Sequence, residues 1–128
     1  MTQTPLRFAG ALALTTALAL SATACGSADK KAACEKLQNT IQQTSRTGMT
    51  QINNPNALAQ TYVNSAATMR QEGKDSGDGD VEKAANHAAS AMEKLGGQVK
   101  ASAGGNPQFP DSSDLISAGK ELKQACDG

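Results

Sequence analysis

The sequence predicts an all-α protein, an up-and-down four-helix bundle closed by one disulfide that follows a cleaved signal peptide. Three observations support this fold class. Four segments carry apolar residues at alternating steps of three and four, which is the period of an amphipathic helix. Gly, Pro, Asn and Asp cluster between these segments, and no stretch alternates apolar and polar residues as a strand does. Successive amphipathic helices joined by short turns are typical of an up-and-down bundle.

The first segment of the chain has the pattern of an export signal. Arg7 precedes an uncharged apolar run over residues 8–20, which is shorter than the roughly 20 residues that cross a hydrocarbon layer. Ala22 and Ala24 then provide the small residues that an ordinary signal peptidase requires before its cut. We therefore expect residues 1–24 to be removed.

A cysteine follows the predicted cut. The run Ala-Thr-Ala-Cys over residues 22–25, followed by Gly-Ser, resembles the lipobox of bacterial lipoproteins, with Ala22 where Leu is usual. The resemblance implies a diacylglycerol on the Cys25 thiol and an anchor on the outer face of the cell membrane. It also implies a short tether over residues 25–29 and a helical domain over residues 30–128. The same cut without the lipid would release a secreted soluble protein.

The cysteine count is consistent with this anchor. Three cysteines in an exported chain leave one over, and a lipid on Cys25 accounts for it. Cys34 and Cys126 are then predicted to form a disulfide, as is expected in an oxidising compartment. Closing a loop of about 90 residues would stabilise the fold by about 4–5 kcal/mol in the chain-entropy model. The alternative is two unpaired buried thiols.

The first two helices are predicted from their stripes and caps. Asp29 or Ser27 can cap the first helix, and Asn54 followed by Pro55 begins the second. Gly73 is expected to end the second helix, and a polar loop follows it. The first stripe comprises Cys34, Leu37, Ile41, Ser45, Met49 and Ile52. The second comprises Leu58, Tyr62, Ala66 and Met69.

The third helix has the most regular stripe, and the fourth closes the bundle. Gly96-Gly97 is expected to end the third helix or to let it fray to about Ser102. The Gly- and Pro-rich linker over residues 104–110 cannot be helical, and Asp111 with Asp114 resembles a capping box for the last helix. The third stripe comprises Val81, Ala85, Ala88, Met92, Leu95 and Val99. The fourth comprises Leu115, Gly119, Leu122 and Cys126.

The predicted topology places both disulfide cysteines at one end. In an up-and-down bundle the first helix starts where the fourth helix ends, and Cys34 and Cys126 fall there on the apolar stripes of their helices. A tether of four residues, 26–29, extends at most about 14 Å. If Cys25 carries a lipid, we expect the disulfide end to be held near the membrane surface.

Composition and motifs exclude several classes of function. The 12 basic and 12 acidic residues cancel, and the chain has one Tyr, two Phe and no Trp, so it lacks both the field and the stacking surfaces that nucleic-acid binding uses. No nucleophile elbow, zinc motif, phosphate-binding loop or dinucleotide fingerprint is present. We therefore expect no nucleic-acid partner, no cofactor and no catalytic residues.

Two weak groups of candidate ligands remain. Tyr62 on an inward stripe and His87, the single histidine, could form a haem ligand pair, although a core ring and a solvated imidazole are the simpler interpretations. The acidic loop offers oxygen ligands for a metal ion, but Lys83 stands where an EF-hand loop requires Gly. A solvated turn whose last Asp caps the third helix explains the loop equally well. Its candidate ligands are Asp75, Asp78, Asp80 and Glu82.

These patterns predict a lipid-anchored protein of the cell envelope that acts by binding. The chain is small and rich in Ala and Gly, and in this it resembles uncharacterised small lipoproteins of actinobacteria, a likeness that implies no activity. Its partners would be the membrane, through Cys25, and another envelope protein. An envelope carrier of haem or a metal ion is the alternative, and an envelope hydrolase built on His87 is the third hypothesis.

Overall fold

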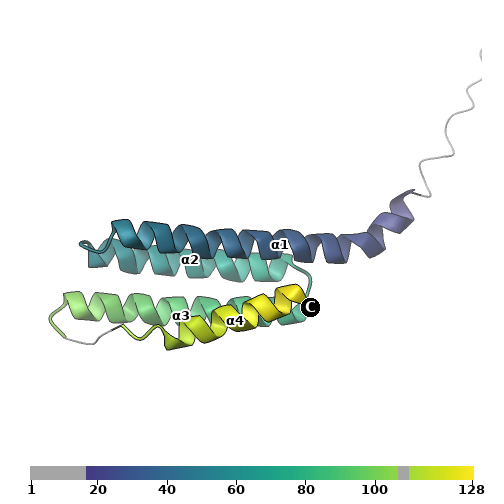
Figure 1. Cartoon of the computed structure of the whole chain (residues 1–128). Helices are drawn as coiled ribbons and strands as arrows, with labels where there is room; N and C mark the ends of the chain where they lie inside the picture. Colours follow the sequence, from purple (N-terminus) through teal and green to yellow (C-terminus); the bar gives the residue numbers. More distant parts are fainter. Residues whose placement is uncertain (1–16, 107–109) are drawn as a thin grey trace, which may run out of the picture.

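The computed structural model describes the backbone of residues 17–106 and 110–128, and the side chains of this part from residue 28 onward. All regular structure in the described residues is helical, and none of them lies in a strand. The helices are shown in Figure 1: α1 (Ala17–Thr50), α2 (Pro55–Asp75), α3 (Gly79–Ala103) and α4 (Ser113–Asp127). The predicted all-α class is confirmed.

α1 begins earlier than predicted. It starts at Ala17 and continues through Ser27 and Asp29, so the prediction that one of these residues caps the helix is wrong. The Ala-rich sequence on either side of Cys25 contains no proline that would interrupt the helix. Residues 1–16 of the predicted signal peptide, like the Cys25 side chain, lie outside the described residues.

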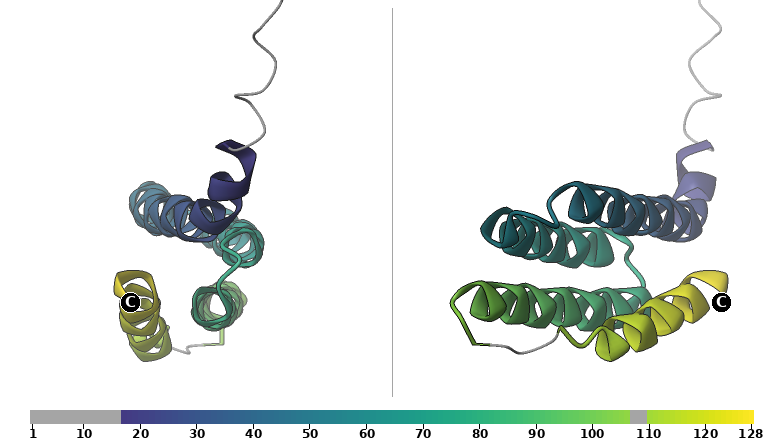
Figure 2. Two further views of the ribbon diagram at one scale, coloured as in Figure 1. Left: turned by 90° about the vertical axis from the view of Figure 1, so that its right-hand side faces the viewer. Right: turned by 60° about the vertical axis from the view of Figure 1, so that its left-hand side comes forward.

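The helices pack in the order of the chain. α2 and α3 form the most extensive pair, α1 packs on α2, and α4 packs on α3. α1 makes few contacts with α3 or α4. The end-on view in Figure 2 shows α2 and α3 close together on one side, with α1 and α4 separated on the other. One side of the helical bundle is therefore less closely packed than the rest.

The core consists largely of methyl groups. Every residue of the predicted α3 stripe is buried, and buried Ala side chains occur on all four helices. The third stripe is thereby confirmed. The largest side chains that are completely buried belong to Leu37, Val81, Met69 and Met92.

Two glycines that were expected to end or weaken helices allow close packing instead. A Cβ atom on Gly73 would lie 2.7 Å from the Cβ of Ala85, and one on Gly96 would lie 3.2 Å from the carbonyl oxygen of Ala59. α2 therefore continues past Gly73 to Asp75, and α3 continues past Gly96 to Ala103. The predicted end of α2 at Gly73 is wrong, and for α3 the second alternative, continuation to about Ser102, agrees with the structure. In both helices the packing of α2 against α3 outweighs the low helix propensity of glycine.

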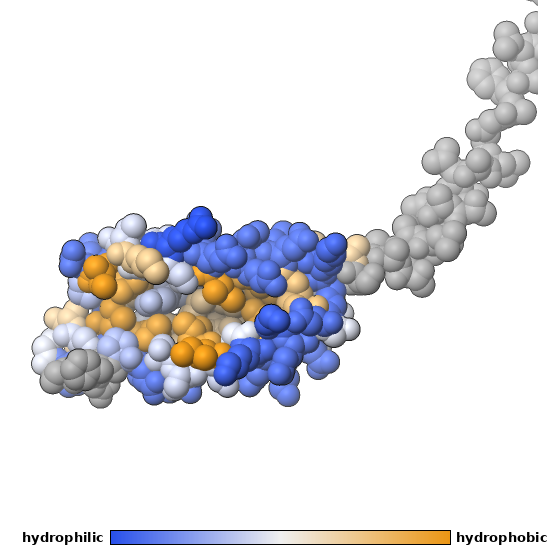
Figure 3. Space-filling view, viewed as in Figure 1, coloured by the Kyte–Doolittle hydropathy of each residue, from blue (hydrophilic) through white to orange (hydrophobic). Residues whose placement is uncertain are grey.

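The far half of the α1 stripe is exposed. Met49 is 77% exposed and Ile52 is 72% exposed, although both were predicted to face inward. The ion pair between Lys94 and Asp114 places the start of α4 partway along α3, so the C-terminal end of α1 has no part of α4 opposite it. Figure 3 shows apolar residues along this face, between the polar outer surfaces of α1 and α4.

The inward position in the middle of α1 belongs to Thr44 and not to Ser45. Thr44 is buried, and its hydroxyl lies 2.7 Å from the carbonyl oxygen of Thr40 and 2.6 Å from the hydroxyl of Ser65 on α2. Ser45 is exposed. Thr44 therefore bonds to α2, and its burial leaves no hydroxyl unpaired.

Helix caps are confirmed at α2 and differ at α4. The side chain of Asn54 accepts a hydrogen bond from the backbone N–H of Ala57 at 3.2 Å, as predicted. At α4 the Asp111 side chain accepts from the N–H of Ser113 at 2.9 Å, one residue before the helix-cap position. Asp114 pairs with α3 instead of completing the predicted capping box, because a lysine of α3 lies within reach.

Candidate functional site

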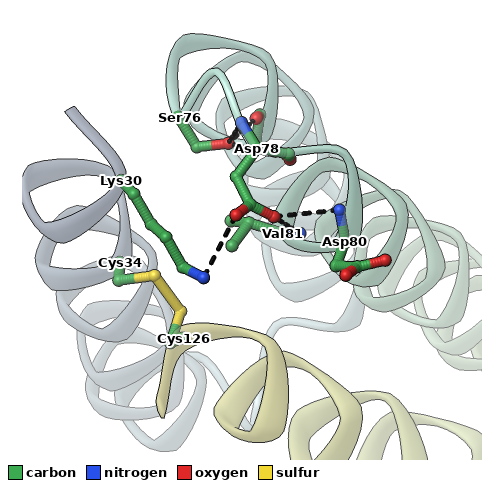
Figure 4. The surroundings of a disulfide bond; sticks show 8 residues. Lys30, Cys34, Ser76, Asp78, Asp80, Val81 and Cys126 are labelled. Atoms are coloured by element: carbon green, nitrogen blue, oxygen red, sulfur yellow. Dashed lines mark hydrogen bonds and ion pairs between the residues drawn. A yellow bond between two sulfur atoms is a disulfide. The ribbon is translucent and has the colours of Figure 1, made fainter. Parts of the chain in front are cut away.

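The disulfide joins the first and last helices of the bundle. Cys34 on α1 and Cys126 on α4 are bonded, with their Cα atoms 5.8 Å apart (Figure 4). This confirms the pairing predicted from the cysteine count and the apolar stripes. Since α1 and α4 otherwise make few contacts, the bond is a principal link between them.

Asp78 lies beside the disulfide and caps α3. Its Oδ1 accepts hydrogen bonds from the backbone N–H groups of Asp80 at 3.0 Å and Val81 at 3.1 Å, and its Oδ2 lies 3.1 Å from Lys30 Nζ on α1 (Figure 4). The Val81 N–H is the main cause of a lowered Asp78 pKa, and Lys30 lowers it further. The cap was predicted at the last Asp of the loop, but Asp78 occupies it because α3 begins at Gly79.

The candidate metal ligands do not form a cation site. Asp78 is engaged by α3 and Lys30, and Asp75 Oδ1 accepts a hydrogen bond from Gln71 at 2.9 Å. Among the described residues, no group of three or more His, Cys, Asp or Glu side chains, with Asp80 and Glu82 included, is arranged to hold a metal ion. The side chain of Asp75 instead bonds within the last turn of α2, and that of Asp78 bonds to the first turn of α3.

Tyr62 and His87 face different parts of the molecule. His87 is 44% exposed on the outer side of α3, where its Nδ1 lies 2.7 Å from Glu121 Oε2 on α4. Tyr62 is half-buried and faces the interior between the helices. The structure therefore does not bring these two side chains together as a haem ligand pair. His87 contributes to holding α4 against α3.

An apolar cleft lies between α1 and α4. Its outer part has a volume of about 320 Å³, with Ile41, Leu122 and Cys126 along its wall and Gln38, Gln42 and Lys123 at its polar edge. An inner cavity of about 120 Å³ extends toward α2 and α3. The apolar band in Figure 3 lies on this side of the molecule. The inner cavity is lined by Ile41, Tyr62, Ala88, Met92, Leu115 and Gly119, with the hydroxyl side chains of Thr44 and Ser45.

Gly119 lines both parts of the cleft, as Ile41 does. It lies on the inward stripe of α4 between Leu115 and Leu122. A Cβ atom built on Gly119 would meet no other atom within 4 Å. The periodicity of the sequence places Gly119 on this stripe but predicts no cleft. The sequence does contain a signal for the cleft, because a glycine on a core-facing stripe leaves a gap unless a neighbouring side chain fills it.

The fold and cleft define a class of protein, a disulfide-linked helical bundle with an apolar cleft between its first and last helices. Within the described part of the chain, none of the helices has both the length and the apolar character that crossing a membrane requires. No protein-family model, curated protein or solved structure matches the chain.

Proposed function

We propose that this chain is an exported lipoprotein, anchored through Cys25, whose domain binds an apolar ligand in the cleft between α1 and α4. The domain would be an up-and-down four-helix bundle. The observation that carries the binding role is the cleft itself, which is apolar along its walls and polar at its edge, as ligand sites usually are. Its lining contains no carboxylate or imidazole, which favours a binding role over acid–base catalysis.

Two features support the anchor. The lipobox-like run ends at Cys25, and the bond between Cys34 and Cys126 leaves that cysteine without a partner in the chain. Cys25 precedes Cys34 by nine residues, about 14 Å along a helix. A lipid on Cys25 would therefore keep the disulfide end of the domain close to the membrane, with the cleft beginning at that end.

Mass spectrometry of the membrane fraction tests the anchor. We expect a mature chain that begins at Cys25 and carries added acyl mass, together with a Cys25→Ser variant that appears unmodified in the medium. An unmodified wild-type chain in the medium would contradict the anchor and would support the secreted form. The disulfide makes both masses two hydrogens lower than the reduced value.

An apolar fluorescent probe tests the binding role. We expect N-phenyl-1-naphthylamine to bind the soluble Cys25→Ser protein, and Ile41→Gln to weaken that binding because Ile41 lines both parts of the cleft. Val63→Gln is the matched control, since Val63 is an exposed β-branched residue on α2 outside the cleft. Equal binding by the two variants would contradict a site between α1 and α4. If cross-linking through residue 41 instead captures one defined protein, the cleft would be the binding site of an envelope protein.

A further inference from the structure

The shape of the cleft restricts what can occupy it. The outer part is open to solvent, whereas the inner cavity is narrower, less open and lined by residues from all four helices. A helix with its side chains is about 10–12 Å wide, so it could lie across the outer part but could not enter the inner cavity. An apolar cavity of about 150 Å³ accommodates a benzene ring. The inner cavity of about 120 Å³ is therefore suited to the end of a narrow hydrocarbon chain.

We infer that Gly119 leaves a passage between the two parts, which it lines together with Ile41. Packed interiors contain few voids larger than a water molecule, yet the position that faces inward between Leu115 and Leu122 has no side chain, and a methyl group added there would meet no other atom within 4 Å. Ile41 on α1 forms the opposite wall of both parts. A chain one methylene wide could therefore run from the outer edge past Gly119 to Tyr62 and Met92.

The polar edge suits the head group of such a ligand. Lys123 lies at the outer edge with Gln38 and Gln42, so a cation and two amides surround the mouth while the walls are apolar. Lys123 Nζ also lies 3.2 Å from Asp127 Oδ2, in a pair whose side chains are both largely exposed. Exposed pairs of this kind contribute little stability, and the ammonium group can therefore turn toward an anionic head group.

We propose that the cleft binds the hydrocarbon chain of a lipid that is separate from the anchor, with the chain end at Tyr62 and the head group at Lys123. This inference rests on the proposed function, because the anchor on Cys25 would place the mouth of the cleft near the membrane. The anchor's own chains are unsuitable occupants. A single acyl chain gives only marginal membrane binding, so drawing one of two chains into the cleft would loosen the anchor.

Fatty-acid titration tests the proposal on a protein without an anchor. The probes are dodecanoate and dodecan-1-ol, and the protein is the mature Cys25→Ser chain purified from the medium. The chain has one Tyr and no Trp, so its intrinsic fluorescence reports on Tyr62 at the inner cavity. We expect saturable binding of one dodecanoate, a change in Tyr62 emission, and about fourfold weaker binding for each methylene removed. Calorimetric binding without this chain-length dependence would overturn the proposal.

Two glycine variants locate the site. Gly119→Leu fills the passage, and Gly97→Leu places the same side chain on the exposed side of α3, where a Cβ atom also meets nothing within 4 Å. Both replace a helical glycine, so we expect both to fold, and thermal unfolding would verify this. Gly119→Leu should weaken dodecanoate binding at least tenfold, and Gly97→Leu should leave it unchanged. Equal affinity in the two variants would overturn the proposal.

A lysine variant tests the position of the head group. We expect Lys123→Gln to weaken the binding of dodecanoate while leaving that of dodecan-1-ol unchanged, because only the carboxylate interacts with the ammonium group. An equal effect on both probes would overturn this placement. Binding of N-phenyl-1-naphthylamine without dodecanoate binding would overturn the lipid inference and leave the apolar-ligand function standing. Acylation of Cys25 is measured separately, so the failure of either proposal can be recognised on its own.

Discussion

Leu37 and Ile52 are large aliphatic residues on the same predicted stripe with opposite degrees of burial. Leu37 is completely buried near the disulfide end, whereas Ile52, just past the end of α1, is largely exposed. We expect Leu37→Ala to lower the free energy of unfolding by about 2–5 kcal/mol, and Ile52→Ala to change it by less than about 0.5 kcal/mol. Urea unfolding of both variants measures this difference. Similar losses would mean that the far end of α1 is covered in solution.

The same substitution should have opposite effects at Gly73 and Gly119. An added methyl group at Gly73 would lie 2.7 Å from the Cβ of Ala85 and 3.3 Å from the Cα of Glu82, so the α2 and α3 backbones must separate. We expect Gly73→Ala to lower stability by about 1–3 kcal/mol. Gly119→Ala should raise it by about 1 kcal/mol, since the methyl group meets no neighbour and alanine favours the helix. Thermal unfolding of the two variants checks both signs.

At the scale of single elements, the cap of α3 should make stability depend on pH. The N–H of Val81, with Lys30, lowers the Asp78 pKa in the folded protein below the value of about 3.9 expected for the unfolded chain. The stabilisation is therefore fully present above the unfolded pKa and is lost as pH falls through the folded pKa.

A pair of variants separates the cap from the ion pair. Asp78→Ala removes both interactions, whereas Lys30→Gln removes the ion pair and leaves the cap hydrogen bonds to the backbone of Asp80 and Val81. We expect Asp78→Ala to lower the midpoint of urea unfolding more than Lys30→Gln at pH 7, and its difference from wild type to shrink below about pH 4. A difference that persists at pH 2 would contradict a role for the carboxylate charge.

The hydrophobic periodicity predicted the buried face of a helix best where that helix has neighbours along its full length. α3 packs between α2 and α4, and its whole predicted stripe is buried. α1 has α4 opposite only part of its length, so the period correctly placed Cys34, Leu37 and Ile41 against the core but did not show that Met49 is exposed. The predictions at Gly73 and Gly96 used local helix propensity, which does not depend on the helix packed alongside. The cleft at Gly119 was missed for a related reason, because a gap depends on the separation of α1 and α4.

At the scale of the whole molecule, the packing is uneven around the bundle. α2 and α3 form the close-packed centre, and α1 and α4 lie outside them with the cleft between. Binding regions are commonly drawn from the less stable parts of a fold. The disulfide at one end of the cleft therefore has two effects in the proposed function, since it stabilises the fold and limits how far α1 and α4 can separate.

Removal of the disulfide should loosen α4 before it loosens the centre. We expect the Cys34→Ser/Cys126→Ser protein to lose about 4–5 kcal/mol of stability in the chain-entropy model. α4 would then be held to α3 by its buried Leu122 and Ala118 and by the exposed pairs at His87 and Lys94, which contribute little. In native-state hydrogen exchange the amides of α4 should therefore lose the most protection, and those of α2 and α3 the least. Equal losses in α2, α3 and α4 would show that the bond stabilises the bundle as one unit and does not govern the opening of the cleft.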